Sequence, residues 1–187
     1  MRFGRRFSVF CAGLLIGCAG VPGTTLEKMP VERMADLARV IARARCLSNS
    51  TGWDAGEIWT FTSFEVAETW KGSASERFTV RLLGGTVGSL TSHVSGVPRF
   101  RAREEVVLFL EPTARGDFTV VSWKQGTFRV GRDPRNGAEL VTQDTAGFET
   151  FDAQTRQFRA SGIRSLPLEV FRAEVQSALA ERAGSKP

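Results

Sequence analysis

The feature that most constrains the fold is Val106–Leu110, a nearly unbroken run of apolar residues. A short run of this kind is typical of a strand that is covered on both faces in the centre of a sheet. The segment Ile58–Val66 is rich in the aromatic and β-branched residues that strands favour. Its even-numbered residues share one face, and Trp59 and Phe61 lie on the other. We therefore expect both faces of this strand to be partly covered.

Further strand signals extend from Ala44 to about Thr142, with turn residues between them. Asn136–Gly137 is a strong hairpin signal. Gly84–Gly88 could expose backbone amides to an anion. A phosphate-binding loop is followed by a lysine and the start of a helix, and neither follows here, so a turn or bulge is expected. The other predicted strands are centred on Phe78–Leu82, Phe118–Val121 and Thr127–Val130. The middle of the chain thus predicts a β-rich domain.

Two segments with helical periodicity flank these strands. In the first, which Pro30 can begin, the spaced apolar residues are Val31, Met34, Leu37, Ala38 and Ile41. In the second, which follows Ser165 and Pro167, they are Leu168, Phe171, Val175 and Leu179. Residues 143–165 are mostly polar and are expected to form a long loop with little regular structure.

The first residues of the chain have the features of an export signal. Three arginines precede the apolar run Phe7–Ile16, which is shorter than the roughly 20 residues that span a bilayer. Leu15–Cys18 resembles the lipobox of bacterial lipoprotein signals, in which the cysteine is acylated and becomes the new first residue. The resemblance implies lipidation of Cys18, and two or three acyl chains give stable membrane anchoring where one is marginal.

Other interpretations of this segment stay open. An ordinary signal peptidase could cleave after Ala19, and Arg5–Arg6 suggests a twin-arginine route, although Ser8 interrupts the expected apolar pair. Without lipidation, Cys18 could form a disulfide with Cys46, the one other cysteine outside the signal.

The predicted organisation is a signal peptide at 1–17, a tether at 18–29, one domain at 30–182 and a frayed tail at 183–187. The signal holds three of the 25 basic residues and none of the 20 acidic ones, so its removal lowers the formal charge from +5 to +2. The basic composition is therefore a poor argument for nucleic-acid binding, and we expect no nucleic-acid partner.

Several motifs resemble a group of small exported bacterial proteins without an established activity. They are Ala35–Leu37, Ile58–Thr60, Val66–Gly72, Val97–Phe100, Glu105–Leu110 and Gln125–Phe128, which together span about residues 30–130. The layout is more distantly similar to the netrin-like barrel of metalloproteinase inhibitors, an OB-type fold. The resemblance implies a mainly β (α+β) fold, with a small barrel of five to seven antiparallel strands between an N-terminal and a C-terminal helix. An open sandwich is the alternative.

The residues offer little metal or nucleophilic chemistry. With one histidine, and one cysteine left beside the predicted lipidation site Cys18, a zinc site is not expected, and no cofactor is predicted. Cys46 and His93 could in principle form a nucleophile and base. A buried, inert thiol and a surface histidine are the preferred interpretation. Glu104 and Glu105 would point to opposite faces of an extended chain and so could not work as a close pair.

A cluster of arginines is the predicted binding patch. In extended form, Arg99, Arg101 and Arg103 would fall on one face a few ångströms apart, where guanidinium groups suit phosphates or carboxylates. The simpler alternative is a charged edge strand that resists aggregation.

These features together predict a non-enzymatic lipoprotein of the cell envelope, in the outer membrane and facing the periplasm or the surface. It would be held to the membrane by the lipid on Cys18 and act as a binding or accessory domain through one barrel face. Expected partners are an envelope protein, an anionic glycolipid or an exported protease. The alternatives are a netrin-like inhibitor of an exported protease and a small enzyme that uses Cys46 or an unrecognised carboxylate site.

Overall fold

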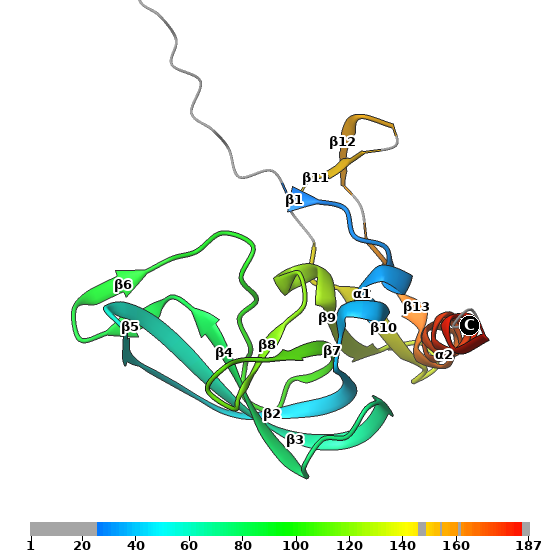
Figure 1. Ribbon diagram of the computed structural model, residues 1–187. Coiled ribbons are helices and arrows are strands. Elements are labelled where there is room, and N and C mark those ends of the chain that lie inside the picture. The colour runs from blue at the N-terminus through cyan, green and yellow to red at the C-terminus, as the bar shows by residue number, and fades with distance from the viewer. Residues whose placement is uncertain (1–25, 146–148, 154, 161, 185–187) are drawn as a thin grey trace, which may run out of the picture.

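The computed structural model describes residues 26–145, 149–153, 155–160 and 162–184. The protein is mainly β, with two α-helices (Figure 1). In chain order the elements are β1 (Leu26–Glu27), α1 (Val31–Leu37), β2 (Val40–Asp54), β3 (Glu57–Lys71), β4 (Arg77–Leu83), β5 (Gly85–Val87), β6 (Leu90–Ser92), β7 (Glu105–Pro112), β8 (Phe118–Val120), the 3-10 helix η1 (Trp123–Gly126), β9 (Thr127–Arg132), β10 (Glu139–Gln143), β11 (Glu149–Asp152), β12 (Gln157–Ala160), β13 (Leu166–Pro167) and α2 (Leu168–Gly184).

The largest sheet has eight strands in the order β13-β10-β9-β7-β2-β3-β4-β8. Its pairings are antiparallel except for β4 and β8, which are parallel and meet at Val80 and Phe118. The sheet is therefore mixed and larger than the five to seven antiparallel strands predicted. In addition, β8 pairs with β7, so it lies between β4 and β7 (Figure 1).

The two faces of this sheet bury separate hydrophobic cores, and β7 contributes to both. Its alternate residues Val106, Leu108 and Leu110 point into the first core, with Phe64 and Phe78. Val107 and Phe109 point into the second core, which packs against α1 and α2. The prediction of a central strand covered on both faces is confirmed.

The first predicted helix is shorter than its apolar spacing suggested. α1 ends at Leu37, and Val40 and Ile41 instead begin β2, where they pair with Leu110 and Phe109 of β7. Pairing with the apolar central strand outweighs the helical periodicity there, since tertiary contacts routinely override weak local preference.

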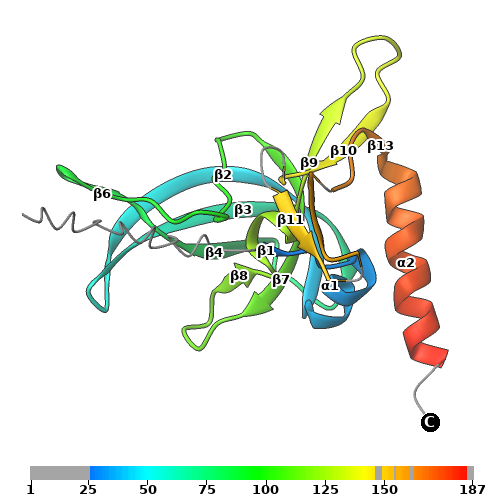
Figure 2. The same cartoon turned by 90° about the horizontal axis from the view of Figure 1, so that it is seen from above.

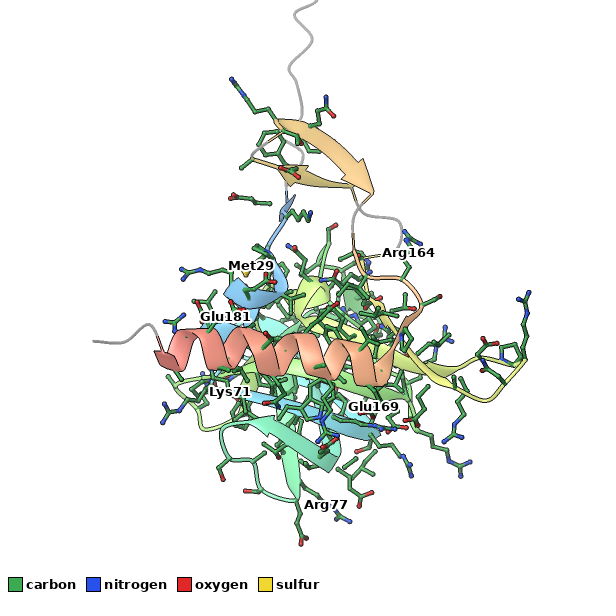
Figure 3. All side chains as sticks on the ribbon, turned by 90° about the vertical axis from the view of Figure 1, so that its right-hand side faces the viewer. Met29, Lys71, Arg77, Arg164, Glu169 and Glu181 are labelled. Atoms are coloured by element: carbon green, nitrogen blue, oxygen red, sulfur yellow. The ribbon has the colours of Figure 1, made fainter. Side chains whose placement is uncertain are left out.

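The second predicted helix is confirmed. It covers part of the face of the sheet that carries the second core, which we call the outer face. Leu168, Phe171 and Val175 are buried along one side of α2. Figure 3 looks onto its exposed side, from Glu169 to Glu181. The β5–β6 hairpin lies at the opposite end of the molecule (Figure 2).

The segment predicted as a long loop contains regular structure. β11 and β12 pair there as a hairpin, and β1 adds to it in parallel. Residues at the end of the predicted tether are thus bound to the domain, because Lys28 N also donates to Phe151 O and Met29 N to Gln125 Oε1. Polar sequence with scattered phenylalanines concealed this small sheet.

Candidate binding site

The predicted arginine patch does not form as an extended strand. Residues 97–104 lie outside any strand, and Arg103 has a positive φ of 69° within a turn. The alternation that would place the three side chains on one face is therefore absent. Cys18, the predicted lipidation site, lies outside the described residues.

Arg99 has a structural role. Its Nη1 donates to Thr60 Oγ1 at 2.8 Å and to Gly84 O at 3.1 Å. Gly84 has a φ of +90°, and a Cβ there would lie 2.8 Å from Arg99 Nη2, so glycine allows this close approach. Arg99 thus ties its loop to β3 and to the β4–β5 connection. Like Arg101 and Arg103, it is exposed.

Cys46 is buried, as predicted, with 1% of its surface exposed, and its thiol is free. Burial raises the pKa of this thiol, and the nearby Glu104 raises it further. A thiol with a raised pKa stays protonated at neutral pH and is a poor nucleophile. His93 is exposed, as predicted. Among the described residues, no group of three or more His, Cys, Asp or Glu side chains could hold a metal ion.

Glu104 and Glu105 engage different arginines and do not form a pair. Glu104 binds Arg129, and Glu105 Oε1 lies 2.6 Å from Arg43 Nε. Arg43 also binds Glu139, with 2.7 Å between Nη2 and Oε1. These half-buried networks connect neighbouring strands. Because Glu104 and Glu105 are both paired with arginines, neither is free to act as a general acid or base.

One of these networks predicts a pH effect. The Arg43 guanidinium lowers the pKa of Glu139 below its ordinary value through a hydrogen bond and its charge. The pair therefore stabilises the fold above the unfolded-state pKa of about 4.3, and this contribution is lost as the pH falls through the lower folded-state pKa. We expect Glu139→Gln to lower the melting temperature at pH 7, by a margin that shrinks below about pH 4. Thermal unfolding from pH 7 to pH 3 measures this.

Glu76→Gln, at an exposed carboxylate, is the matched control and should change the melting temperature little at any pH. A Glu139→Gln margin that stays constant from pH 7 to pH 3 contradicts the assignment.

The pocket of most chemical interest lies between two turns, one joining β2 to β3 and the other joining β7 to β8. It has a volume of about 340 Å³, at the lower end of the range for small-molecule sites. The lining residues are Asp54, Ala55, Trp59, Arg81, Thr113, Ala114, Arg115 and Thr119.

Strand pairing places the aromatic and cationic side chains of this pocket side by side. Phe61 pairs with Arg81, and Trp59 pairs with Leu83 two residues on. Because the neighbouring residues Val80 and Leu82 point into the first core, Arg81 points to the opposite, outer face. Its guanidinium carbon lies 4.2 Å from the centre of the Trp59 ring, a cation–π contact.

Arg81 is a buried cation with two carboxylates near it. Its side chain is 6% exposed and forms an ion pair with Asp54, and its Nε lies 3.8 Å from Asp117 Oδ2. Arg115 Nη2 binds the other oxygen of Asp54 at 2.9 Å. Asp54 thus joins the two arginines, and this contact connects the β2–β3 turn to the β7–β8 turn.

Two donor atoms of the residues that line this pocket have no acceptor within hydrogen-bond distance. They are Trp59 Nε1 and Arg81 Nε. Among the described residues, these two are the buried side-chain polar atoms that have no hydrogen-bond partner. A buried donor without a partner costs about 1–3 kcal/mol, and such groups in native proteins call for an explanation. Both residues line the same pocket, which suggests that the pocket binds a group able to accept hydrogen bonds.

Sequence reasoning did not identify Arg81. A charged residue at an outward strand position is ordinary, and the burial of Arg81 is not visible in sequence. The available signal was the aromatic pair Trp59 and Phe61 on the outer face of their strand, which predicted that this face is covered.

We found no protein-family model and no curated protein that matches this sequence. Within the described ranges, neither α1 nor α2 is long and apolar enough to cross a membrane. The function is therefore inferred from the pocket and from the signal-like N-terminus.

Proposed function

We propose that this protein is a non-enzymatic binding domain of the cell envelope, anchored by a lipid on Cys18. It binds its ligand at the pocket on the outer face of β3, β4 and β8. The observation that carries the proposal is the buried Arg81 stacked on Trp59, with a donor atom of each residue left without an acceptor. Such donors are satisfied when a ligand supplies acceptor atoms.

An OB-type barrel is the architecture we propose for the sheet region. The pairings β7–β2, β2–β3, β3–β4, β4–β8 and β8–β7 follow one another round a ring, which supports closure. In OB-type folds, ligands bind on the second and third strands, beside the turns between strands one and two and between strands four and five. The corresponding elements here are β3, β4 and the two turns that line the pocket.

Export and anchoring rest on Leu15–Cys18 and the arginine-flanked apolar run before it. They are tested by labelled-palmitate incorporation in an exporting bacterial host, with the wild-type chain and Cys18→Ser. We expect label on the wild type and none on the variant. Label on neither would contradict the lipid anchor and favour the alternative in which Cys18 is a thiol or leaves with the signal.

Binding is tested by the melting temperature of the purified protein with one probe from each of several ligand classes. These are neutral oligosaccharides, sulfated oligosaccharides, single-stranded DNA and acidic peptides. The proposal expects at least one class to raise the melting temperature of the wild type more than that of a Trp59→Phe variant. A panel in which no probe distinguishes the two proteins contradicts a binding function at this pocket.

A further inference from the structure

We propose that the Trp59–Arg81 pocket binds a neutral saccharide unit. A sugar ring would lie against the indole and the methyl groups of Ala55 and Ala114, with its hydroxyls near Arg81 and Asp54. The inference rests on the proposed binding function and names its ligand class.

The charges of the pocket favour a neutral ligand. The charged residues of the lining are Arg81, Arg115 and Asp54, and Asp117 lies just outside it, with its Oδ2 3.8 Å from Arg81 Nε. With this neighbour included, the four formal charges cancel. Both guanidinium groups already have carboxylate partners. Nucleic-acid backbones and other polyanions are bound by cations that neutralise phosphates and release counterions. Here an incoming anion would have to compete with Asp54 and would be repelled by Asp117.

The hydrogen-bonding groups favour hydroxyls in particular. Trp59 Nε1 and Arg81 Nε need acceptors, whereas the carboxylate of Asp54 only accepts. A hydroxyl group both donates and accepts, so a polyhydroxylated ring can satisfy both kinds of group at once. Each oxygen of Asp54 accepts from one arginine, and a carboxylate has about four acceptor positions, so capacity remains.

The apolar part of the wall fits the same ligand. Besides the charged groups, the lining contains the indole of Trp59, two alanine methyl groups and the methyl groups of Thr113 and Thr119. A sugar ring carries C–H groups on its faces and hydroxyls on its rim, which matches this arrangement. Mostly apolar walls with a few placed polar groups are the usual composition of small-molecule sites.

Ligand entry requires a local movement, because both donor atoms are covered in this structure. The β7–β8 turn supplies Thr113, Ala114 and Arg115 to the pocket wall, and its residues 114–116 are exposed. The salt bridge between Arg115 and Asp54 holds this turn in place, and the Arg115 side chain is 57% exposed. Since Arg115 is the exposed member of this ion pair, its side chain is held weakly, and a ligand that offers two or more hydrogen bonds can displace it while Thr113 and Ala114 keep their places in the wall.

Another hollow lacks these features. The space beside α1 and Lys71 is larger, about 700 Å³. However, Lys71 Nζ there donates to the carbonyl oxygens of Ala35, Asp36 and Ala38. That amine caps the end of α1 and offers little to a ligand.

The test is titration calorimetry of the purified protein with maltotetraose and with tetra-N-acetylchitotetraose, beside a sulfated oligosaccharide and a single-stranded DNA. We expect at least one neutral saccharide to bind and neither anion to bind. Trp59→Phe removes the unsatisfied N–H and keeps an aromatic ring. It should weaken saccharide binding about tenfold, the loss of one hydrogen bond, without lowering the melting temperature of the free protein.

Trp70→Phe is the matched control, because Trp70 Nε1 already donates to Glu68 Oε2 at 3.0 Å. It should lower the melting temperature and leave saccharide affinity unchanged. Binding of an anionic probe alone, with loss in Trp59→Phe, overturns the saccharide assignment and leaves the proposed function standing. Saccharide binding that Trp59→Phe does not weaken also overturns the assignment, and no binding by any probe overturns both.

Discussion

Phe64→Ala is expected to lower the free energy of unfolding by about 3–5 kcal/mol, the usual cost of removing a fully buried phenylalanine. Phe64 is 0% exposed at the centre of the first core. Its ring stacks on Phe78 at 5.4 Å between centres and meets Phe100 edge-on at 5.0 Å. Alanine would leave a cavity among strands that are fixed by their pairing, so little collapse can compensate. Urea unfolding followed by fluorescence measures the change.

Phe158→Ala is the matched control, since the Phe158 side chain is 54% exposed. It loses one aromatic contact, with Phe151 at 5.3 Å, and should cost less than about 1 kcal/mol. A Phe64→Ala loss no greater than that of Phe158→Ala would contradict the packing of the first core.

Sequence pattern predicted the strands best where burial is strongest. Val106–Leu110 could be assigned because a strand covered on both faces needs apolar residues at every position. The buried face of β3 followed from alternation, and Ile58, Thr60, Thr62 and Phe64 are all buried. α2 could be predicted because one apolar side packs on the sheet and the other faces solvent.

Elements that depend on distant partners were harder to predict. α1 stops at Leu37 because Val40 and Ile41 pair with β7, some 70 residues further along the chain. The small sheet of β1, β11 and β12 joins the start of the described chain to residues 149–160. The parallel contact of β4 with β8 likewise has no local signature, since it joins residues 80 and 118.

The candidate site shows the same limit. Arg99 stood out because three arginines are close in sequence, yet it binds a backbone carbonyl and Thr60. Arg81 is unremarkable in sequence and becomes chemically distinctive through Trp59, Asp54 and a turn more than 30 residues away. Proximity along the chain pointed to a surface cluster, whereas the pocket depends on burial that only tertiary structure supplies.

Phe171→Ala is expected to be as costly as Phe64→Ala, about 3–5 kcal/mol, but through the second core. Phe171 is 0% exposed and joins α2 to the sheet. Its ring lies 4.4 Å from that of Phe128, and Trp70 and Phe109 are its other aromatic neighbours. Alanine would remove the residue at the centre of this contact. Urea unfolding measures the loss, and Val170→Ala, at a neighbouring position that is 45% exposed, should cost less than about 1 kcal/mol.

The two cores lie on opposite faces of the sheet, so their contributions should be nearly independent. Phe64 and Phe171 share no aromatic partner: Phe64 contacts Phe78 and Phe100, and the neighbours of Phe171 are three different rings. Milder Phe→Leu changes keep the double variant folded. Their losses should add to within about 0.5 kcal/mol, as for independent sites. A larger coupling would mean that packing changes on one face of β7 pass through the strand to the other, and the separation into two cores would be wrong.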